Sequence, residues 1–386
     1  MTPTRERVTS VVVRPAGAPG RDACDPAALP ARAGATAGGP REHEALAVLA
    51  GALTAEAGLT EAGARTAAGA IGAALATVDR VRAATGPAIT AGTVPGPLVL
   101  TGLHRTGTTL LQRTLAAHPA IHAPRLWELM SPAEDGTEAG LVDRARRYVD
   151  EYHAAAPGFR EIHPLDPEGP EECHRLIGPT LRSEIYAMRY RVPGYLAWLD
   201  RQDHRPGYRF HRAALRAVLR RRPPAAGTRS VLLKCPLHLR HLAALAEVYP
   251  GARLVRLHRD PVTALVSGCS LIAAIRGARA AAVDRAEIGS FWLDRTAATA
   301  ALMCEPAPLP VLDVRYDDLV RDPAGVAAAV CDFAGVPVTA ADQARMRRAA
   351  TAGRRPGGHR YAPEDYGLRA GPLADRFADY RTRFAV

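Results

Sequence analysis

The chain has 386 residues and is 47% hydrophobic, enough for a large core, and 50 Lys+Arg against 39 Asp+Glu give a net charge of +11. The arginines are scattered without a block of like charges, which argues against a nucleic-acid groove and favours a small anionic ligand. The longest apolar stretch, 262–275, is too short for a membrane span, and the N-terminus lacks a secretory apolar core, so we expect a cytoplasmic protein.

The basic side chains are divided unevenly between the two types. Lys234 is the only lysine, and all other basic side chains except the histidines are arginine. In a composition that so favours arginine, the surviving lysine marks a position where a compact ammonium is needed. The six cysteines form no C-x-x-C pair and no zinc spacing with histidine, so we expect free thiols and no metal site.

Composition and periodicity divide the chain into three parts. Residues 1–40, rich in Gly, Pro and Ala, predict a disordered tail, and 41–95 predict a helical N-terminal extension. In 96–386 short apolar runs alternate with helical patterns, which predicts an α/β fold with a P-loop-like parallel sheet flanked by helices. The expected strands are 98–100, 231–233, 254–257 and 311–314.

A helical insertion is expected over about 143–222. It is dense in aromatic residues, which we expect to wall an acceptor site: Tyr186, Tyr190, Tyr195, Trp198 and Tyr208.

The first strand runs into a Gly/Thr-rich turn and an apolar helix (97–119). The turn nearly matches the Walker pattern G-x-x-x-x-G-K-S/T, but Thr108 stands in place of the lysine. The glycines permit a tight backbone path and the N–H groups at the helix start face an anion. We therefore expect a phosphoryl or phosphosulfuryl group to be bound by Arg105, Thr106, Gly107, Thr108, Thr109 and Leu110.

The turn resembles the 5′-phosphosulfate loop of the sulfotransferase superfamily, whose form is Lys/Arg-Ser/Thr-Gly-Thr/Ser-Thr/Ser after the first strand. The segment RTGTT (105–109) fits this form throughout. Downstream, Arg259-Asp-Pro follows a strand and Ser267 lies two turns into the next helix, where both can reach one phosphate. This pair is similar to the family's 3′-phosphate motif.

Lys234 and His238 lie where bacterial members of the family carry K-x-P-x-H. Lys234, with Arg105 beside it, is expected to stabilise the charge that grows on the bridging oxygen of the leaving phosphate. In residues 359–368 the resemblance implies that Arg360 and Tyr361 contact the cofactor. The resemblance covers about 97–386 and is best with the bacterial group near the tyrosylprotein enzymes.

The general base is left open between two residues. Relatives of the tyrosylprotein and glycolipid type use a glutamate shortly after the first helix, which implies Glu128 after a small loop shift. Aryl and steroid enzymes use a histidine two residues after the lysine, whereas His238 is four residues after Lys234. Glu128 is narrowly favoured.

The predicted function is transfer of a sulfuryl group from 3′-phosphoadenosine-5′-phosphosulfate (PAPS) to a hydroxyl or amine of a small-molecule acceptor, with secondary metabolites as one class, and without a metal. The alternatives are an atypical P-loop kinase or nucleotide phosphotransferase, and a non-catalytic nucleotide-binding homologue. The acceptor's identity, the oligomeric state and the role of residues 1–95 stay open.

Overall fold

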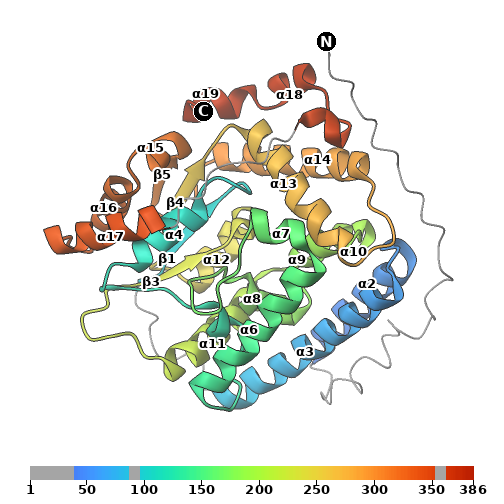
Figure 1. The fold of residues 1–386 in the computed structure, drawn as a ribbon, viewed down its shortest axis with the longest axis horizontal. Coiled ribbons are helices and arrows are strands. Elements are labelled where there is room, and N and C mark those ends of the chain that lie inside the picture. Colours follow the sequence, from blue (N-terminus) through green and yellow to red (C-terminus); the bar gives the residue numbers. More distant parts are fainter. Residues whose placement is uncertain (1–38, 87–95, 353–361) are drawn as a thin grey trace, which may run out of the picture.

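A computed structural model describes residues 39–86, 96–352 and 362–386, with a sheet of five parallel strands at its centre (Figure 1). The predicted α/β class is confirmed, and the four expected strands are present. A further strand of two residues was not predicted, because so short a run carries no periodicity. The strands are β1 (Leu98–Gly102), β2 (Ile121–His122), β3 (Ser230–Lys234), β4 (Arg253–His258) and β5 (Val311–Arg315).

The strand order β2-β3-β1-β4-β5 brings the predicted motifs to one edge of the sheet. The chain runs first to β2 and β3 on one side of β1 and then crosses to β4 and β5 on the other. Parallel α/β sheets bind ligands at the carboxyl edge beside such a switch point. The register pairs Leu100 with Lys234 and Gly102 with Leu257, so the segments that follow β1, β3 and β4 lie next to one another.

Alternate side chains of β1 pack into different layers. Leu98 and Leu100 belong to the core on one face, whereas Val99 belongs to the core on the other. Helices from segments far apart in sequence cover both faces, as the predicted fold class requires. The first face carries α4 (Thr108–Ala116), α16 (Pro323–Phe333) and α17 (Ala340–Ala352), and the second α11 (Arg205–Arg221) and α12 (Leu242–Val248).

A helical layer with one shared core joins the N-terminal region, much of the insertion and the helices after β4. Its buried members include Leu49, Ile71, Met188, Ile272 and Trp292. The two N-terminal helices lie against α10 and α11 (Figure 1). The predicted tail lies outside the described residues except for its last two positions. The layer consists of α2 (Pro40–Glu56), α3 (Glu61–Thr85), α6 (Glu138–Ala155), α7 (Pro157–Ile162), α9 (Ile185–Arg189), α10 (Pro193–Leu199), α13 (Pro261–Gly277) and α14 (Arg285–Cys304).

The aromatic residues of the insertion belong mainly to this core. Tyr186, Tyr190 and Tyr195 are buried, and the Tyr195 hydroxyl donates to the carbonyl of Leu181 at 2.8 Å. Their rings are packed against other core side chains, which argues against an acceptor wall for Tyr186 and Tyr195, whereas Tyr190 also lines a pocket with Arg276 and Arg279. Tyr208, which is also buried, does line a cavity.

The remaining helices are short and complete the connections. None of the helices in the described ranges is long and apolar enough to cross a membrane. The short helices are α5 (Leu126–Met130), α8 (His174–Ile177), η3 (Gly178–Thr180), η4 (Pro236–His241), α15 (Tyr316–Arg321), η5 (Pro363–Tyr366), α18 (Ala370–Arg376) and α19 (Ala378–Phe384).

Candidate active site

The predicted phosphate loop is a tight turn between β1 and α4. A side chain at Gly102 would lie 2.5 Å from the Thr106 hydroxyl and 2.7 Å from the Leu257 carbonyl, so the position has no room for one. Gly107 precedes α4 with φ +92°, a conformation that favours glycine. The Thr106 hydroxyl donates to the Leu103 carbonyl at 2.8 Å and closes the turn. The first N–H groups of α4, from Thr108 on, have no partner within the helix and suit an anion.

Arg105 joins this loop to the second predicted motif. Its backbone has φ +67°, and its guanidinium donates to the Ser267 hydroxyl at 3.3 Å and to the Ile162 carbonyl at 2.8 Å. Arg259 donates to the Arg105 carbonyl at 2.9 Å, and its guanidinium lies 4.1 Å from the centre of the Tyr316 ring. Residues more than 150 positions apart therefore meet at one edge of the sheet, as the predicted phosphate sites require.

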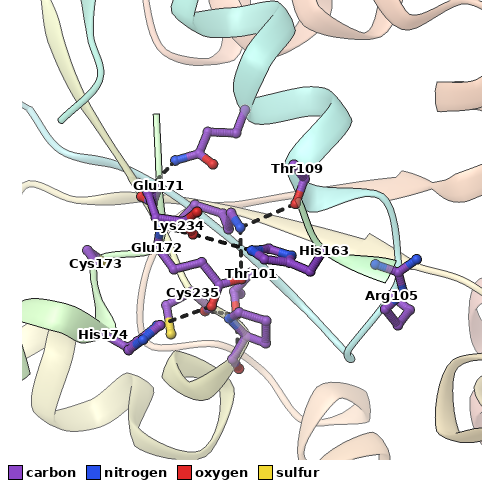
Figure 2. Close-up of polar contacts among 12 residues, drawn as sticks. Thr101, Arg105, Thr109, His163, Glu171, Glu172, Cys173, His174, Lys234 and Cys235 are labelled. Atoms are coloured by element: carbon purple, nitrogen blue, oxygen red, sulfur yellow. Dashed lines mark hydrogen bonds and ion pairs between the residues drawn. The ribbon is translucent and has the colours of Figure 1, made fainter. Parts of the chain in front are cut away.

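Lys234 is the last residue of β3, is 1% exposed and points toward the start of α4 (Figure 2). Its ammonium donates to Glu172 Oε1 at 2.8 Å and to Thr109 Oγ1 at 3.4 Å. A buried ammonium needs such a carboxylate partner, because desolvation otherwise disfavours its charge. The lone lysine thus lies directly at the phosphate loop.

Two adjacent carboxylates complete the group around Lys234. Glu172 also contacts His174 Nδ1 at 3.2 Å, and Glu171 lies 3.6 Å from His163 Nε2 (Figure 2). Burial acts to raise the pKa of both carboxyls, but the nearby cations outweigh it. The pKa of Glu171 falls to about 2, mainly through His163, and the pKa of Glu172 falls well below its usual value, mainly through Lys234. Both are carboxylates at neutral pH.

The segment with these glutamates is held by the backbone of its neighbours. The Glu171 amide donates to the Pro124 carbonyl, and the Glu171 carbonyl accepts from Gln112 Nε2 at 3.0 Å. The Cys173 amide donates to the Lys234 carbonyl at 3.0 Å. Glu172 is therefore fixed between α4 and the end of β3.

The structure places Glu128 elsewhere. Its carboxylate is bidentate on Arg222, at 2.6 and 2.8 Å, and also accepts from the Arg125 amide at 2.7 Å. The side chain is fully buried, and these partners hold it against Arg222 rather than against Lys234 and the phosphate loop. The predicted role of Glu128 as the base disagrees with this geometry.

His238 is likewise enclosed in the core, 1% exposed. Its Nε2 lies 3.1 Å from Cys173 Sγ and its Nδ1 2.8 Å from the Tyr208 hydroxyl. Both ring nitrogens therefore have partners away from the phosphate loop, which also argues against His238 as the base. Arg360 and Tyr361 lie outside the described residues.

Sequence reasoning missed Glu172, Glu171 and His163. They lie in the insertion, in connections between helices rather than after a predicted strand. The available signal was the run Glu171-Glu172-Cys173-His174 (EECH), a pair of acids followed by two potential ligands within an arginine-rich segment. Nothing in that run indicates which strand end it faces.

A pocket lies next to the loops that follow β1 and β3. Leu237, Ile272 and Trp292 form apolar parts of its wall, and His104 of the phosphate loop and Glu184 add polar groups. The mixture of a largely apolar wall and a few polar groups is typical of sites for small molecules.

The fold and the site together define an α/β protein with a phosphate-type loop after its first strand and a buried lysine at the end of the neighbouring strand. Residues 97–340 match the sulfotransferase family. This match covers more than half of the chain, which therefore belongs to the sulfotransferase family.

Individual relatives agree. The chain is 26% identical over 243 residues to the omega-hydroxy-beta-dihydromenaquinone-9 sulfotransferase Stf3 of Mycobacterium bovis. The match covers 59% of this chain and 60% of that protein, so the chain spans about 60% of the length of the curated relatives it matches. The crystal structure of sulfotransferase STF1 from Mycobacterium tuberculosis is 30% identical, covers 92% of this chain and 97% of its own, and superposes with a TM-score of 0.76. Sulfotransferase STF9 from Mycobacterium avium (23%, TM-score 0.80, covering 96% and 97%) supports the fold alone.

Proposed function

We propose that the protein transfers a sulfuryl group from PAPS to a hydroxyl of a small-molecule acceptor. The observation that carries the proposal is the position of Lys234, whose ammonium lies between Thr109 of the phosphate loop and Glu172. A cation there faces the point where the leaving phosphate of a bound donor gains charge. Family membership supports the same reaction.

The residues present fit this donor. The turn closed by Thr106, with no room for a side chain at Gly102, brings backbone N–H groups to a 5′-phosphosulfate. Arg259 and Ser267, linked through Arg105, suit the 3′-phosphate that distinguishes PAPS from other adenine nucleotides. When bound, the donor supplies the activated sulfuryl group.

In the proposed step the acceptor oxygen bonds to sulfur as the bond from sulfur to the bridging phosphate oxygen breaks. Lys234 donates a hydrogen bond to that oxygen as its charge grows, and Arg105 adds positive charge. Glu172 takes the acceptor proton, because it is the carboxylate at the loop, and later releases it to water. This assignment replaces Glu128.

We further propose that the acceptor's body lies in the pocket beside these loops and is partly apolar, since Leu237, Ile272 and Trp292 line it. The name of the Mycobacterium bovis relative gives a hydroxylated menaquinone as its acceptor, which is also a largely apolar alcohol. A cytoplasmic location is proposed as well. The five cysteines that the structure describes are unpaired thiols, which fits a reducing compartment.

Calorimetry with adenosine 3′,5′-bisphosphate tests the donor site. We expect it to bind at least about tenfold more tightly than ADP or ATP, because only it carries the 3′-phosphate, and Arg259→Ala should cost about 1.5–3 kcal/mol of that binding. Arg253→Ala, an exposed arginine at the opposite end of the same strand, is the control and should leave affinity unchanged. Equal affinity for ADP, or no loss in Arg259→Ala, contradicts the proposal.

Turnover separates the remaining alternatives. Transfer of label from PAPS without added magnesium supports the sulfotransferase. Activity with ATP that is lost when a chelator is added and restored by magnesium supports the first alternative, an atypical P-loop kinase or nucleotide phosphotransferase. Tight bisphosphate binding without turnover on any acceptor of a broad alcohol panel supports the non-catalytic homologue.

A further inference from the structure

Three buried side chains from distant segments meet behind the active site. Cys173 precedes α8, His211 lies in α11 and His238 lies in η4, and each is at most 1% exposed. One potential ligand atom of each lies within 4.8 Å of the other two. The Cys173 Sγ–His238 Nε2 distance is 3.1 Å. The sequence itself contains no indication of a metal, because these residues share no motif and 65 positions separate Cys173 from His238.

Tyrosines orient both imidazoles. His238 Nδ1 lies 2.8 Å from the Tyr208 hydroxyl, and His211 Nδ1 lies 2.7 Å from the Tyr249 hydroxyl. If each Nδ1 donates its N–H, each Nε2 carries a lone pair. Such outer hydrogen bonds are typical of histidines that bind metal ions.

His211 Nε2 is an independent indication of a ligand. It is buried and has no hydrogen-bond partner among the residues the structure describes. An unsatisfied buried nitrogen is costly, and native structures usually supply a partner. A metal ion at the cluster would supply one.

The charge states of the histidines suit this role. Burial lowers the pKa of His211 to about 3 and that of His238 to about 4, so both rings are neutral and can donate a lone pair. Burial also raises the pKa of the Cys173 thiol to about 12. A bound cation offsets that penalty by replacing the thiol proton.

We propose that Cys173, His211 and His238 bind one zinc ion. A thiolate and two imidazoles are ligands that zinc accepts, whereas magnesium and calcium prefer oxygen. Zn–S and Zn–N bonds of about 2.3 and 2.0 Å separate tetrahedral ligands by about 3.5 Å, so the cluster needs only small movements. As the Zn–S bond forms, the Cys173 proton passes to water.

A neighbouring cavity provides access for the ion. It is lined by Tyr208, Cys235 and His238, among others. It gives the ion a path and leaves room for a water molecule as the fourth ligand. The site is thus reachable although its protein ligands are buried.

The zinc site acts on the active site through the backbone. Cys173 directly follows Glu172, and its amide donates to the Lys234 carbonyl at 3.0 Å. His238 lies in η4, four residues after Lys234. Zinc therefore ties together the two segments whose side chains meet at the phosphate loop, without itself touching the reacting atoms.

The test uses the full chain, stripped with a chelator, reloaded with Zn²⁺ and passed over a desalting column. Elemental analysis should find one zinc per chain in the wild type. Cys173→Ser and His211→Gln should each bind Zn²⁺ more than about 100-fold more weakly. Cobalt loading of the wild type should give a thiolate-to-cobalt charge-transfer band, which Cys173→Ser abolishes.

Cys331→Ser, a buried cysteine in α16 on the far side of the sheet, is the matched control and should retain zinc. If the ligand variants do not fold, Tyr249→Phe keeps all three ligands and should weaken zinc binding by about 10–100-fold. A wild type that holds no zinc and gives no charge-transfer band overturns the proposal. So does equal zinc loss in Cys331→Ser. Neither result depends on sulfuryl transfer, so it leaves the proposed function unaffected.

Discussion

Lys234 illustrates how composition and geometry bear on one residue. Its partners, a carboxylate at 2.8 Å and a threonine hydroxyl at 3.4 Å, lie in a space that leaves the side chain 1% exposed. A guanidinium is longer and planar, so it cannot direct its charge to the same point. The chain's only lysine is thus at a site where arginine would not be equivalent.

Lys234→Ala should therefore lower kcat by about 10²–10³, as does the loss of one donor to a developing oxyanion, with a smaller loss of bisphosphate affinity. Lys234→Arg should restore little of this rate. Single-turnover kinetics together with calorimetry separates the two effects. Near-normal kcat in Lys234→Arg would show that the lone lysine is an accident of composition.

Some elements of the site were predictable from the sequence and others were not. The phosphate loop and Arg259 follow buried strands, and Lys234 ends one. Parallel strands end at one edge of the sheet, so apolar runs and turn residues suffice to predict that these residues meet. Glu172 lies in a connection of the insertion, where no periodicity indicates what it faces. The partner of Glu128, Arg222, is 94 positions away, and no local pattern predicts such a pair.

Glu128 stabilises the element that supports Glu172. Its ion pair fixes the start of α5, where the Leu126 amide donates to the Gly169 carbonyl and the Pro124 carbonyl accepts from the Glu171 amide. We therefore interpret Glu128 as a positioning residue and propose Glu172 as the base.

Substitution of the two glutamates distinguishes these roles. Glu172→Gln should lower kcat by about 10²–10⁴ with little change in bisphosphate affinity. Glu128→Gln should instead lower the free energy of unfolding by about 1–3 kcal/mol, since Arg222 keeps partial solvent contact, and change kcat less than about tenfold. Glu168→Gln, an exposed neighbour, is the control for both measurements. The reverse ranking of kcat would return the base to Glu128.

At the scale of the whole molecule, α19 packs against the end of β4, the strand that precedes Arg259. Asp313 of β5 accepts from Arg256 at 2.8 and 3.0 Å and lies 2.8 Å from His258 Nε2. His258 Nδ1 in turn lies 2.9 Å from the Tyr380 hydroxyl of α19. One carboxylate thus links β4, β5 and the end of the chain.

We expect the ionised Asp313 carboxylate to stabilise the folded protein, so that its protonation contributes to unfolding in acid. Burial acts to raise the pKa of Asp313, but hydrogen bonds from His258 and Arg256 lower it from 3.8 to about 2. Since the folded-state pKa is the lower one, the stabilisation is complete above about pH 4 and is lost as the pH falls toward 2.

Asp313→Asn should reduce the free energy of unfolding at pH 7 by about 1–2 kcal/mol, a value discounted because the carboxylate is 42% exposed. In urea titrations the difference between wild type and variant should shrink between pH 4 and 2. Asp294, whose carboxylate is 75% exposed, provides the control: Asp294→Asn should change neither the free energy of unfolding at pH 7 nor its pH dependence. A difference that stays constant down to pH 2 would contradict the role assigned to Asp313.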